Sequence, residues 1–292
     1  MNVTDISQRG GYYFTPDIGI FVRDKTYVQF GLDSTRAAIV KSTNAEKLVN
    51  AIRAAQHGPP KSRYVWERLF SSSGMTLLAA RSLFHDLVDY GILRAERDKK
   101  RLVVLGTSPL AKSIRDMCDA RGLGVRQPLN WENLHIYLST MEPGTVVLVV
   151  DQLHNTPLIA RALHELHPTC SWVPLSIIDS RGFIGPLHIR GSGPCPMCFE
   201  LRRAELDPRW AVLTRQLKEV AINPDPQVIA SVTAKTAVIV DWLVGREFPP
   251  GTPKPGAFYA GDFFDVDVYG TSTKRALGQH PQCPECFIAQ TG

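Results

Sequence analysis

Two pairs of cysteines are the residues of this sequence with the clearest capacity for chemistry. Cys195 and Cys198 form one Cys-Pro-x-Cys segment, and Cys283 and Cys286 form a second one close to residue 292. Four thiolates brought together from two such segments can form a closed tetrahedral zinc site with Zn–S distances of about 2.3 Å. Because four protein ligands leave no open coordination position, we predict one structural Zn²⁺ per chain and no catalytic metal.

Two other interpretations of these cysteines remain open at the level of sequence. A redox dithiol would use one CxxC that opens a helix and would not need a second, matching pair. The four residues could also be free buried thiols. Zinc accounts for both pairs together, and it requires that the two tight turns carrying them meet in space. Cys118 and Cys170 complete the six cysteines, and we expect them to be buried thiols, because the pattern contains no disulfide framework.

The composition is that of a chain with a substantial core and a mild positive charge. The 292 residues are 44% hydrophobic, which permits one large domain or two of ordinary size. The net charge of +5 comes from scattered lysines and arginines, so it suits an acidic peptide partner as well as nucleic acid. Residues 1–20 show no signal-peptide pattern, and the longest apolar runs are too short to span a bilayer. We expect a cytoplasmic protein that does not associate with a membrane.

The first 97 residues predict a small mixed domain. Short strands are expected at residues 19–23, 26–30 and 36–41, helices near 45–55, 63–70 and 76–90, and a further strand at 92–95. Three strands, three helices and a final strand are typical of a winged helix-turn-helix domain. We therefore place one domain at residues 1–97 and a second at residues 98–292.

A winged helix-turn-helix domain can bind DNA or a peptide, and the charges favour a peptide. In a DNA reader the helix at 76–90 would enter the major groove, but Asp86 and Asp89 would oppose the approach of phosphates. In a peptide reader an extended segment adds to an edge strand and lies against a helix. A purely structural domain, with Leu77 and Phe84 in its core, is the remaining alternative. The candidate peptide contacts are Arg36, Ala37, Ala38, Ile39, Val40 and Lys41 on the strand, and Leu77, Arg81 and Phe84 on the helix. Their cations would suit an acidic peptide with a few apolar anchors.

The second domain opens like a nucleotide-binding unit, but its glycine loop is damaged. A buried strand at 102–106 leads through Gly106 into a helix expected at 108–121, as in Rossmann-like folds. The loop keeps only the first of the three fingerprint glycines, and Pro109 removes an N–H that could bind phosphate. Asp151 ends a later strand, where we expect it to cap a helix. We predict no ATP in this chain and assign no catalytic residue.

The rest of the second domain alternates strands and helices, which predicts an α/β fold with a Rossmann-like sheet. Helix 226–244 is more hydrophobic than a one-sided surface helix requires, so it is either a core helix or part of a homodimer contact. Strands are expected at 125–127, 145–150, 171–177, 183–189 and within 257–269, and helices at 131–138, 157–167, 210–220 and 226–244.

Residues 100–290 carry a series of short segments that resembles the E1-like activating enzymes, including the ThiF and MoeB adenylyltransferases. The segments are Val149-Val150-Asp151, Trp172-Val173-Pro174, Gly182-Phe183-Ile184-Gly185 and Gly191-Ser192-Gly193-Pro194-Cys195-Pro196-Met197-Cys198. Family members that adenylate also have an intact glycine loop, an acidic residue for the ribose and an aspartate for magnesium. This sequence has no acidic residue after the strand near Val125 and lacks the usual second aspartate after Asp151, and these departures argue against adenylation.

The predicted N-terminal domain that precedes this E1-like part narrows the resemblance to one group within the superfamily. The combination, with Phe199-Glu200-Leu201-Arg202-Arg203 and Asp207-Pro208-Arg209-Trp210, is similar to the ocin-ThiF ("C protein") subunit of cyclodehydratases that form thiazole/oxazole-modified microcins. It implies that residues 1–97 recognise the leader of a precursor peptide for a bacteriocin-type product. It also implies a separate ATP-dependent YcaO-type partner and an FMN-dependent azoline dehydrogenase as a further partner. The alternatives are a self-sufficient ThiF/MoeB-like adenylyltransferase and a winged-helix DNA-binding regulator.

Overall fold

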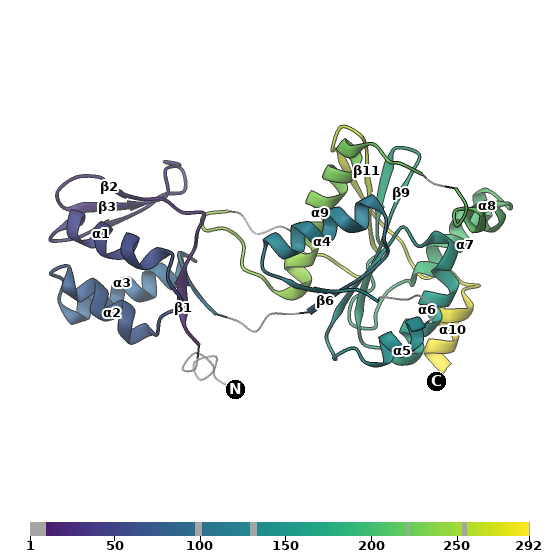
Figure 1. The fold of residues 1–292 in the computed structure, drawn as a ribbon, viewed down its shortest axis with the longest axis horizontal. Helices are drawn as coiled ribbons and strands as arrows, with labels where there is room; N and C mark the ends of the chain where they lie inside the picture. Colours follow the sequence, from purple (N-terminus) through teal and green to yellow (C-terminus); the bar gives the residue numbers. More distant parts are fainter. Residues whose placement is uncertain (1–9, 97–100, 129–132, 221, 253–255, 292) are drawn as a thin grey trace. The chain divides into compact units, whose positions relative to one another are not determined.

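The computed structural model describes residues 10–96, 101–128, 133–220, 222–252 and 256–291, with side chains as far as residue 287. The chain forms two compact units, drawn in Figure 1. Unit 1 contains Met1–Asp98 together with Glu247–Pro255, and unit 2 contains Lys99–Arg246 and Gly256–Gly292. A stretch from the later part of the sequence therefore joins the unit built by the first hundred residues.

The described residues of unit 1 form two small antiparallel sheets and three helices. Strands β2 (Ile20–Val22), β3 (Tyr27–Phe30) and β4 (Ala38–Lys41) form a sheet in that order, so β4 lies at an edge. Strand β1 (Tyr12–Phe14) pairs with β5 (Leu93–Ala95). The helices are α1 (Ala45–Gln56), α2 (Arg63–Ser72) and α3 (Leu77–Asp89). The winged helix-turn-helix assignment itself stays a prediction.

Caps and apolar spacing explain the helices of unit 1. The side chain of Asn44 accepts a hydrogen bond from the Lys47 N–H at the start of α1, and Thr76 caps α3 in the same way. Leu48, Val49 and Ile52 lie on one face of α1 and are fully buried. Strand β1 did not follow from the sequence pattern, because three residues are too short to show a period.

Unit 2 is built on a seven-stranded sheet with the order β12-β11-β10-β9-β8-β6-β7. Its parallel part consists of β6 (Arg101–Leu105), β7 (Gly124–Arg126), β8 (Val146–Val150) and β9 (Ser171–Ile178). Strands β10 (Arg181–Ile184), β11 (Asp262–Val266) and β12 (Ser272–Ala276) continue it with antiparallel pairing. The expected mixed α/β fold with a central, mostly parallel sheet is confirmed.

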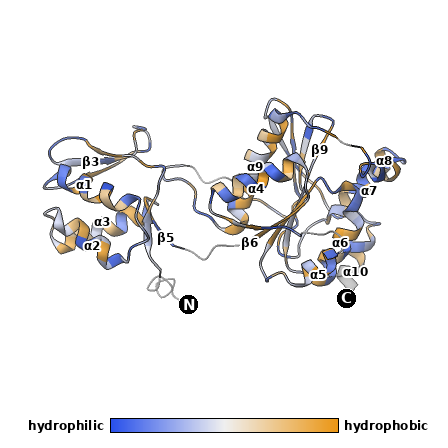
Figure 2. Cartoon of the chain, viewed as in Figure 1, coloured by the Kyte–Doolittle hydropathy of each residue, from blue (hydrophilic) through white to orange (hydrophobic). Residues whose placement is uncertain are grey.

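Helices cover both faces of this sheet (Figure 1). Helices α4 (Pro109–Ala120) and α9 (Pro226–Val244) pack on one face, and α5 (Leu134–Ser139) and α6 (Thr156–Leu166) pack on the other. Leu102 and Val104 of β6 point into the first core, and Val103 and Leu105 point into the second. Strands buried on both faces are continuous apolar runs, which is why Figure 2 shows the middle of the sheet in orange. The remaining helices are η3 (Leu153–Asn155), α7 (Pro196–Leu206), α8 (Trp210–Gln216) and α10 (Pro284–Thr291).

Helix α9 is long and apolar enough, by length and composition alone, to cross a membrane. Half of its most apolar window is buried inside unit 2, where Val228, Val232 and Val240 belong to the core that α4 shares. The helix therefore has the packing of a core helix, which accounts for its hydrophobicity.

Several expected elements differ from those observed. The helix expected at 210–220 ends at Gln216, and the strand expected at 183–189 ends at Ile184. Strand β12 was missed because all five of its residues are exposed, so its sequence shows no alternation of apolar and polar side chains. The helix expected at 131–138 begins outside the described residues, and α5 covers Leu134–Ser139.

Candidate functional sites

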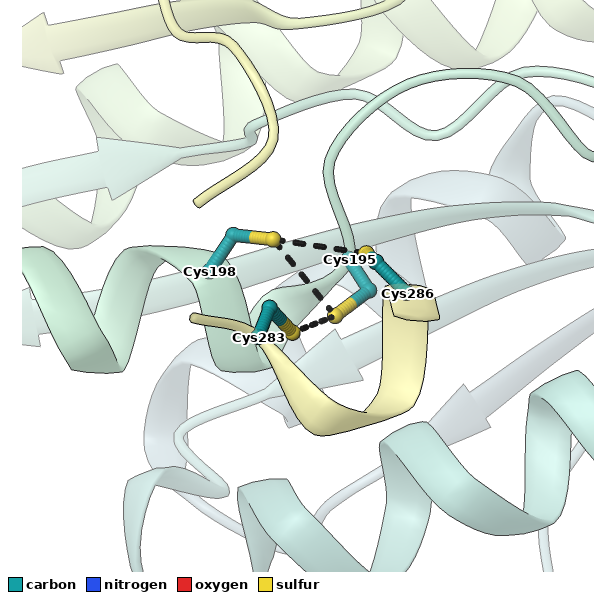
Figure 3. Close-up of side chains that lie close together, drawn as sticks. All are labelled: Cys195, Cys198, Cys283 and Cys286. Atoms are coloured by element: carbon teal, nitrogen blue, oxygen red, sulfur yellow. Dashed lines mark hydrogen bonds between the residues drawn. The ribbon is translucent and has the colours of Figure 1, made fainter. Parts of the chain in front are cut away.

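The four cysteines of the two pairs meet in unit 2. Their sulfur atoms all lie within 4.8 Å of one another and are buried, and Figure 3 shows them pointing toward a common centre. The Cys195 sulfur lies 3.8 Å from that of Cys198 and 3.5 Å from that of Cys283, and the sulfurs of Cys198 and Cys286 are 3.4 Å apart. A tetrahedron with Zn–S bonds of about 2.3 Å has sulfur–sulfur edges of about 3.8 Å. The donor set and its spacing therefore fit Zn²⁺.

Each cysteine pair stands at the start of a helix, and the Cys198 N–H donates to the Cys195 carbonyl at 3.0 Å across the first tight turn. Cys195 is the N-cap residue of α7, and Pro196 occupies its first turn. Pro284 likewise begins α10, between Cys283 and Cys286. A helix start suits a redox pair as well as a metal ligand, because its partial positive charge favours a thiolate. The convergence of all four sulfurs is the feature that favours a metal.

The cysteine cluster is part of the core of unit 2. It shares a buried apolar cluster with Leu163 of α6 and Trp172 of β9, and the backbone N–H of His280 donates to the Cys198 sulfur at 3.3 Å. A metal at this position would link α7 to α10. It would thereby hold the last described residues to the middle of the sheet.

The other two cysteines do not join the cluster. Cys118 is a buried residue of α4, and Cys170 lies in the core on the opposite face of the sheet. Burial raises the pKa of the Cys118 thiol to about 11 and that of Cys170 to about 12. Both remain protonated at neutral pH and have the character of inert core residues.

The loop between β6 and α4 contacts the end of β8 and forms a hydrogen bond to Asp151. Gly106 has a φ of +141°, and a Cβ at this position would lie 2.3 Å from the carbonyl oxygen of Val150. The glycine thus permits the ends of β6 and β8 to approach each other. The Ser108 side chain caps α4 by accepting from the Ala111 N–H, and its hydroxyl donates to the Asp151 carboxylate at 2.5 Å. The Ala111 N–H in the first turn of α4 therefore already has a side-chain acceptor.

Asp151 links two strands of the sheet to the start of α4 and does not cap a helix, so that expectation was wrong. Its second carboxylate oxygen accepts from the Ile177 N–H at 3.0 Å, and the N-cap residues of η3 and α6 are Gln152 and Asn155. Its backbone lies in the left-handed region, with φ of +52°. Burial raises the pKa of this carboxyl group. Asp151 therefore joins β8, β9 and α4 in a single network.

A cavity of about 350 Å³ lies at the carboxyl ends of β6 and β8, where open α/β sheets commonly bind ligands. One wall is apolar, and the described residues that line it include no lysine or arginine. The buried Asp151 carboxylate at this cavity disfavours a polyphosphate. The lining residues are Thr107, Ser108, Pro109, Asp151, Gln152, Leu153, His154, Ile177, Leu217, Val220, Ile222 and Pro224.

The predicted peptide contacts of unit 1 divide into surface and core residues. Arg36 and Ala37 precede β4, which begins at Ala38. On β4, Ala38 and Val40 pack against the core of unit 1, whereas Ile39 is 49% exposed and Lys41 is exposed. On α3, Leu77 is 51% exposed, but Phe84 is only 2% exposed and its ring packs edge-on against Tyr12. Phe84 is a core residue, so we remove it from the candidate contacts.

Strand β4 and helix α3 run side by side in opposite directions. The Tyr90 hydroxyl, at the end of α3, donates to the Arg36 carbonyl at 2.6 Å. The Thr43 hydroxyl, after β4, donates to the Gly74 carbonyl before α3 at 3.3 Å. Contacts at both ends keep the exposed edge of β4 alongside the helix.

The hydrogen-bond pattern shows which backbone groups of β4 face outward. The Ser42 N–H donates to the Thr26 carbonyl at 2.8 Å, in the same register that pairs Val40 with Val28 and Ala38 with Phe30. In an antiparallel ladder the intervening residues direct their N–H and C=O groups away from the partner strand. Ile39 and Lys41 therefore present their backbone groups at the sheet edge.

Arg81 already has a partner. Its side chain is 54% exposed and lies 3.5 Å from the buried carboxylate of Glu67, which also forms an ion pair with Arg63 at 2.6 Å. The two arginines share one buried negative charge. Two arginines and one glutamate leave a net charge of +1, and an acidic peptide would interact with this remaining positive charge.

No protein-family model and no curated protein matches this chain. Among solved structures, it resembles the heterocyclase TruD with a TM-score of 0.56 and 16% identity over 95% of this chain and 43% of that one. It resembles a heterocyclase in complex with substrate and cofactor with a TM-score of 0.57 and 14% identity over 95% of this chain and 39% of that one. This chain spans about two fifths of the length of both.

A third structure matches along almost its whole length. A chain of the E. coli microcin synthetase McbBCD complex with pro-MccB17 bound has a TM-score of 0.57 and 13% identity over 94% of this chain and 99% of that one. At such identities the likeness shows a shared fold. The fold therefore recurs in two heterocyclase structures and in a chain of a microcin synthetase complex.

Proposed function

We propose that this chain is the precursor-leader-binding, E1-like scaffold subunit of an azoline-forming cyclodehydratase that makes a bacteriocin-type product. The observation that carries the proposal is the open edge of β4, held alongside α3 and flanked by the exposed Arg36 and Lys41. The fold shared with two heterocyclases and a microcin synthetase chain supports it. In this proposal, residues 1–97 form a winged helix-turn-helix leader-recognition domain and residues 98–292 form an E1-like zinc domain.

The leader would bind as an additional strand on the edge of β4. The outward backbone groups of Ile39 and Lys41 would supply hydrogen bonds that do not depend on peptide sequence. Leu77 and Arg81 of α3 would contact alternate side chains and so provide specificity. Arg36, Lys41 and Arg81 favour an acidic leader.

The chemical step would belong to a separate YcaO-type partner. A Cys, Ser or Thr side chain of the precursor attacks the preceding amide carbon, ATP phosphorylates the amide oxygen, and loss of phosphate leaves the azoline ring. This chain would hold the leader, which raises the effective concentration of the attached core peptide at the partner. We assign it no catalytic residue and no ATP. Its Zn²⁺ would be structural, held by Cys195, Cys198, Cys283 and Cys286.

The assembly and location follow from the same proposal. We propose a cytoplasmic homodimer that joins the YcaO-type protein and, where azoles are made, an FMN-dependent azoline dehydrogenase. The microcin synthetase structure supports assembly with other chains by analogy, since it is a complex with pro-MccB17 bound.

One observation favours a second candidate function, a ThiF/MoeB-like adenylyltransferase. The cavity at the ends of β6 and β8 lies where such an enzyme would bind its nucleotide. The absence of cations among its described lining residues weighs against it. A winged-helix DNA-binding regulator is disfavoured by Asp86 and Asp89, both exposed on α3.

The test is direct binding of a leader probe to the full chain. The probe is the fluorescein-labelled synthetic leader of the Cys-, Ser- and Thr-rich precursor encoded closest to this chain's gene, followed by anisotropy. We expect saturable binding that Ile39→Ala retains and Ile39→Pro abolishes. The proline removes an N–H that faces outward, so it does not break pairing with β3. Circular dichroism of both variants controls for folding.

Two outcomes would contradict the proposal. One is the absence of saturable binding of the leader probe to the folded chain. The other is ATP–pyrophosphate exchange by the isolated chain, which would support the adenylyltransferase. Addition of the YcaO-type partner and ATP should remove one water per ring from the precursor, as mass spectrometry can measure.

A further inference from the structure

A segment that follows α9 is held inside unit 1 by a buried arginine. The Arg94 side chain is only 8% exposed. Its guanidinium donates to the Phe248 carbonyl at 2.6 Å and to the Gly91 carbonyl at 3.1 Å, and it lies 3.7 Å from the Glu247 carboxylate. We call residues 247–252 the strap.

The strap continues past the end of α3 to the start of β4. A Cβ on Gly91, just after α3, would lie 3.7 Å from Pro250. Gly251 has a φ of +66°, and a Cβ there would lie 2.9 Å from the Arg36 Cβ and 3.2 Å from the Arg36 carbonyl oxygen. Only glycine allows the strap to lie this close to Arg36.

These contacts close one end of the β4 edge. The Arg36 carbonyl already accepts from the Tyr90 hydroxyl, and the Ala37 N–H donates to the Asp33 carbonyl at 2.8 Å. The strap backbone packs against the same Arg36. Backbone groups for a further strand are therefore offered at Ile39 and Lys41 and end before Arg36.

We propose that the strap is part of the peptide site and sets the register of the bound leader. This inference rests on the proposed function. An extended peptide pairs with residues 38–41 and must end or turn where the strap meets Arg36. The half-exposed Arg36 side chain, whose partner Asp33 lies at 3.9 Å, then faces the peptide at this stop and selects an acidic residue there. The recognition unit thus consists of residues 10–96 and 247–252 together.

The test compares two glycines with the same backbone requirement. Gly122 has a φ of +70°, close to that of Gly251, but a Cβ there would meet nothing within 4 Å. Gly251→Leu therefore displaces the strap from Arg36, whereas Gly122→Leu carries the same backbone strain elsewhere. The leader probe is prepared as a series with a photo-crosslinker at successive positions, and each is irradiated with the full-length chain.

In the wild-type chain and in Gly122→Leu, we expect crosslinks to the strap from one leader position or two adjacent ones. In Gly251→Leu the crosslinks spread along the leader, and affinity falls about tenfold because the site loses its pre-organised end. Wild-type binding with the same crosslink pattern and affinity in Gly251→Leu would overturn the role of the strap and leave the proposed function standing. Failure of the wild-type chain to bind the probe would overturn both.

Discussion

The cysteine cluster and the loop between β6 and α4 lie in the same unit, but only one of them is arranged for a ligand. The cluster presents four buried sulfurs at the spacing of a zinc tetrahedron. In the loop, Ser108 is hydrogen-bonded to Asp151 and Pro109 has no N–H to offer. In the described part of unit 2, the cysteine cluster therefore fits a ligand, and the hydroxyl of Ser108 in the loop already has a protein partner. The comparison leaves the edge of β4 in unit 1 as the site that we propose for the leader.

Removing the metal should give the largest effect. Cys283→Ser opens the tetrahedron, and structural zinc can contribute about 10 kcal/mol or more to folding in small zinc domains. We expect one zinc per wild-type chain by elemental analysis, and a metal-free, insoluble or unfolded variant. Cys118→Ala, outside the cluster, should retain zinc. A well-folded wild-type chain containing almost no zinc would show that the cysteine cluster is not a zinc site.

Breaking the loop network should cost stability without affecting peptide binding. Asp151→Ala leaves the Ser108 hydroxyl and the Ile177 N–H without their acceptor, which we expect to cost about 2–4 kcal/mol of unfolding free energy. Asp151→Asn should lose less, because its amide oxygen still accepts and no charge is buried. Urea unfolding measures both variants, with leader-probe affinity as the control. Unchanged stability in Asp151→Ala would show that Asp151 is not a structural link.

Changing the charge beside β4 should have a smaller, more specific effect. Arg81→Glu should weaken binding of the leader probe by about 1–3 kcal/mol if its contact is desolvated. Because Arg81 lies 3.5 Å from Glu67, the new carboxylate also repels a buried neighbour. Arg81→Gln, which removes the charge without this repulsion, should show most of the same loss in anisotropy. Equal affinity in all three chains would exclude Arg81 from the site.

The sequence predicted what depends on local pattern. Apolar spacing located the helices of unit 1 and the central strands of unit 2, and the repeated CxxC identified the four cysteines. The sequence did not predict the features that tertiary contacts determine. Phe84 and Leu77 are both apolar residues of one helix, and only packing shows that one is core and the other surface. Strand β12 has no hydrophobic period, and the roles of Asp151 and Gly251 depend on residues distant in the sequence.

The smallest expected effect gives the sharpest test, because we expect Mg²⁺–ATP to leave the hydrogen exchange of this chain unchanged. Hydrogen exchange of the full chain, followed by mass spectrometry, compares Mg²⁺–ATP with the leader probe. We expect new protection at residues 38–41 with the leader probe, and no change at residues 106–111 with ATP at sub-millimolar concentration. Protection of residues 106–111 by ATP, with none at residues 38–41 by the leader probe, would contradict this expectation.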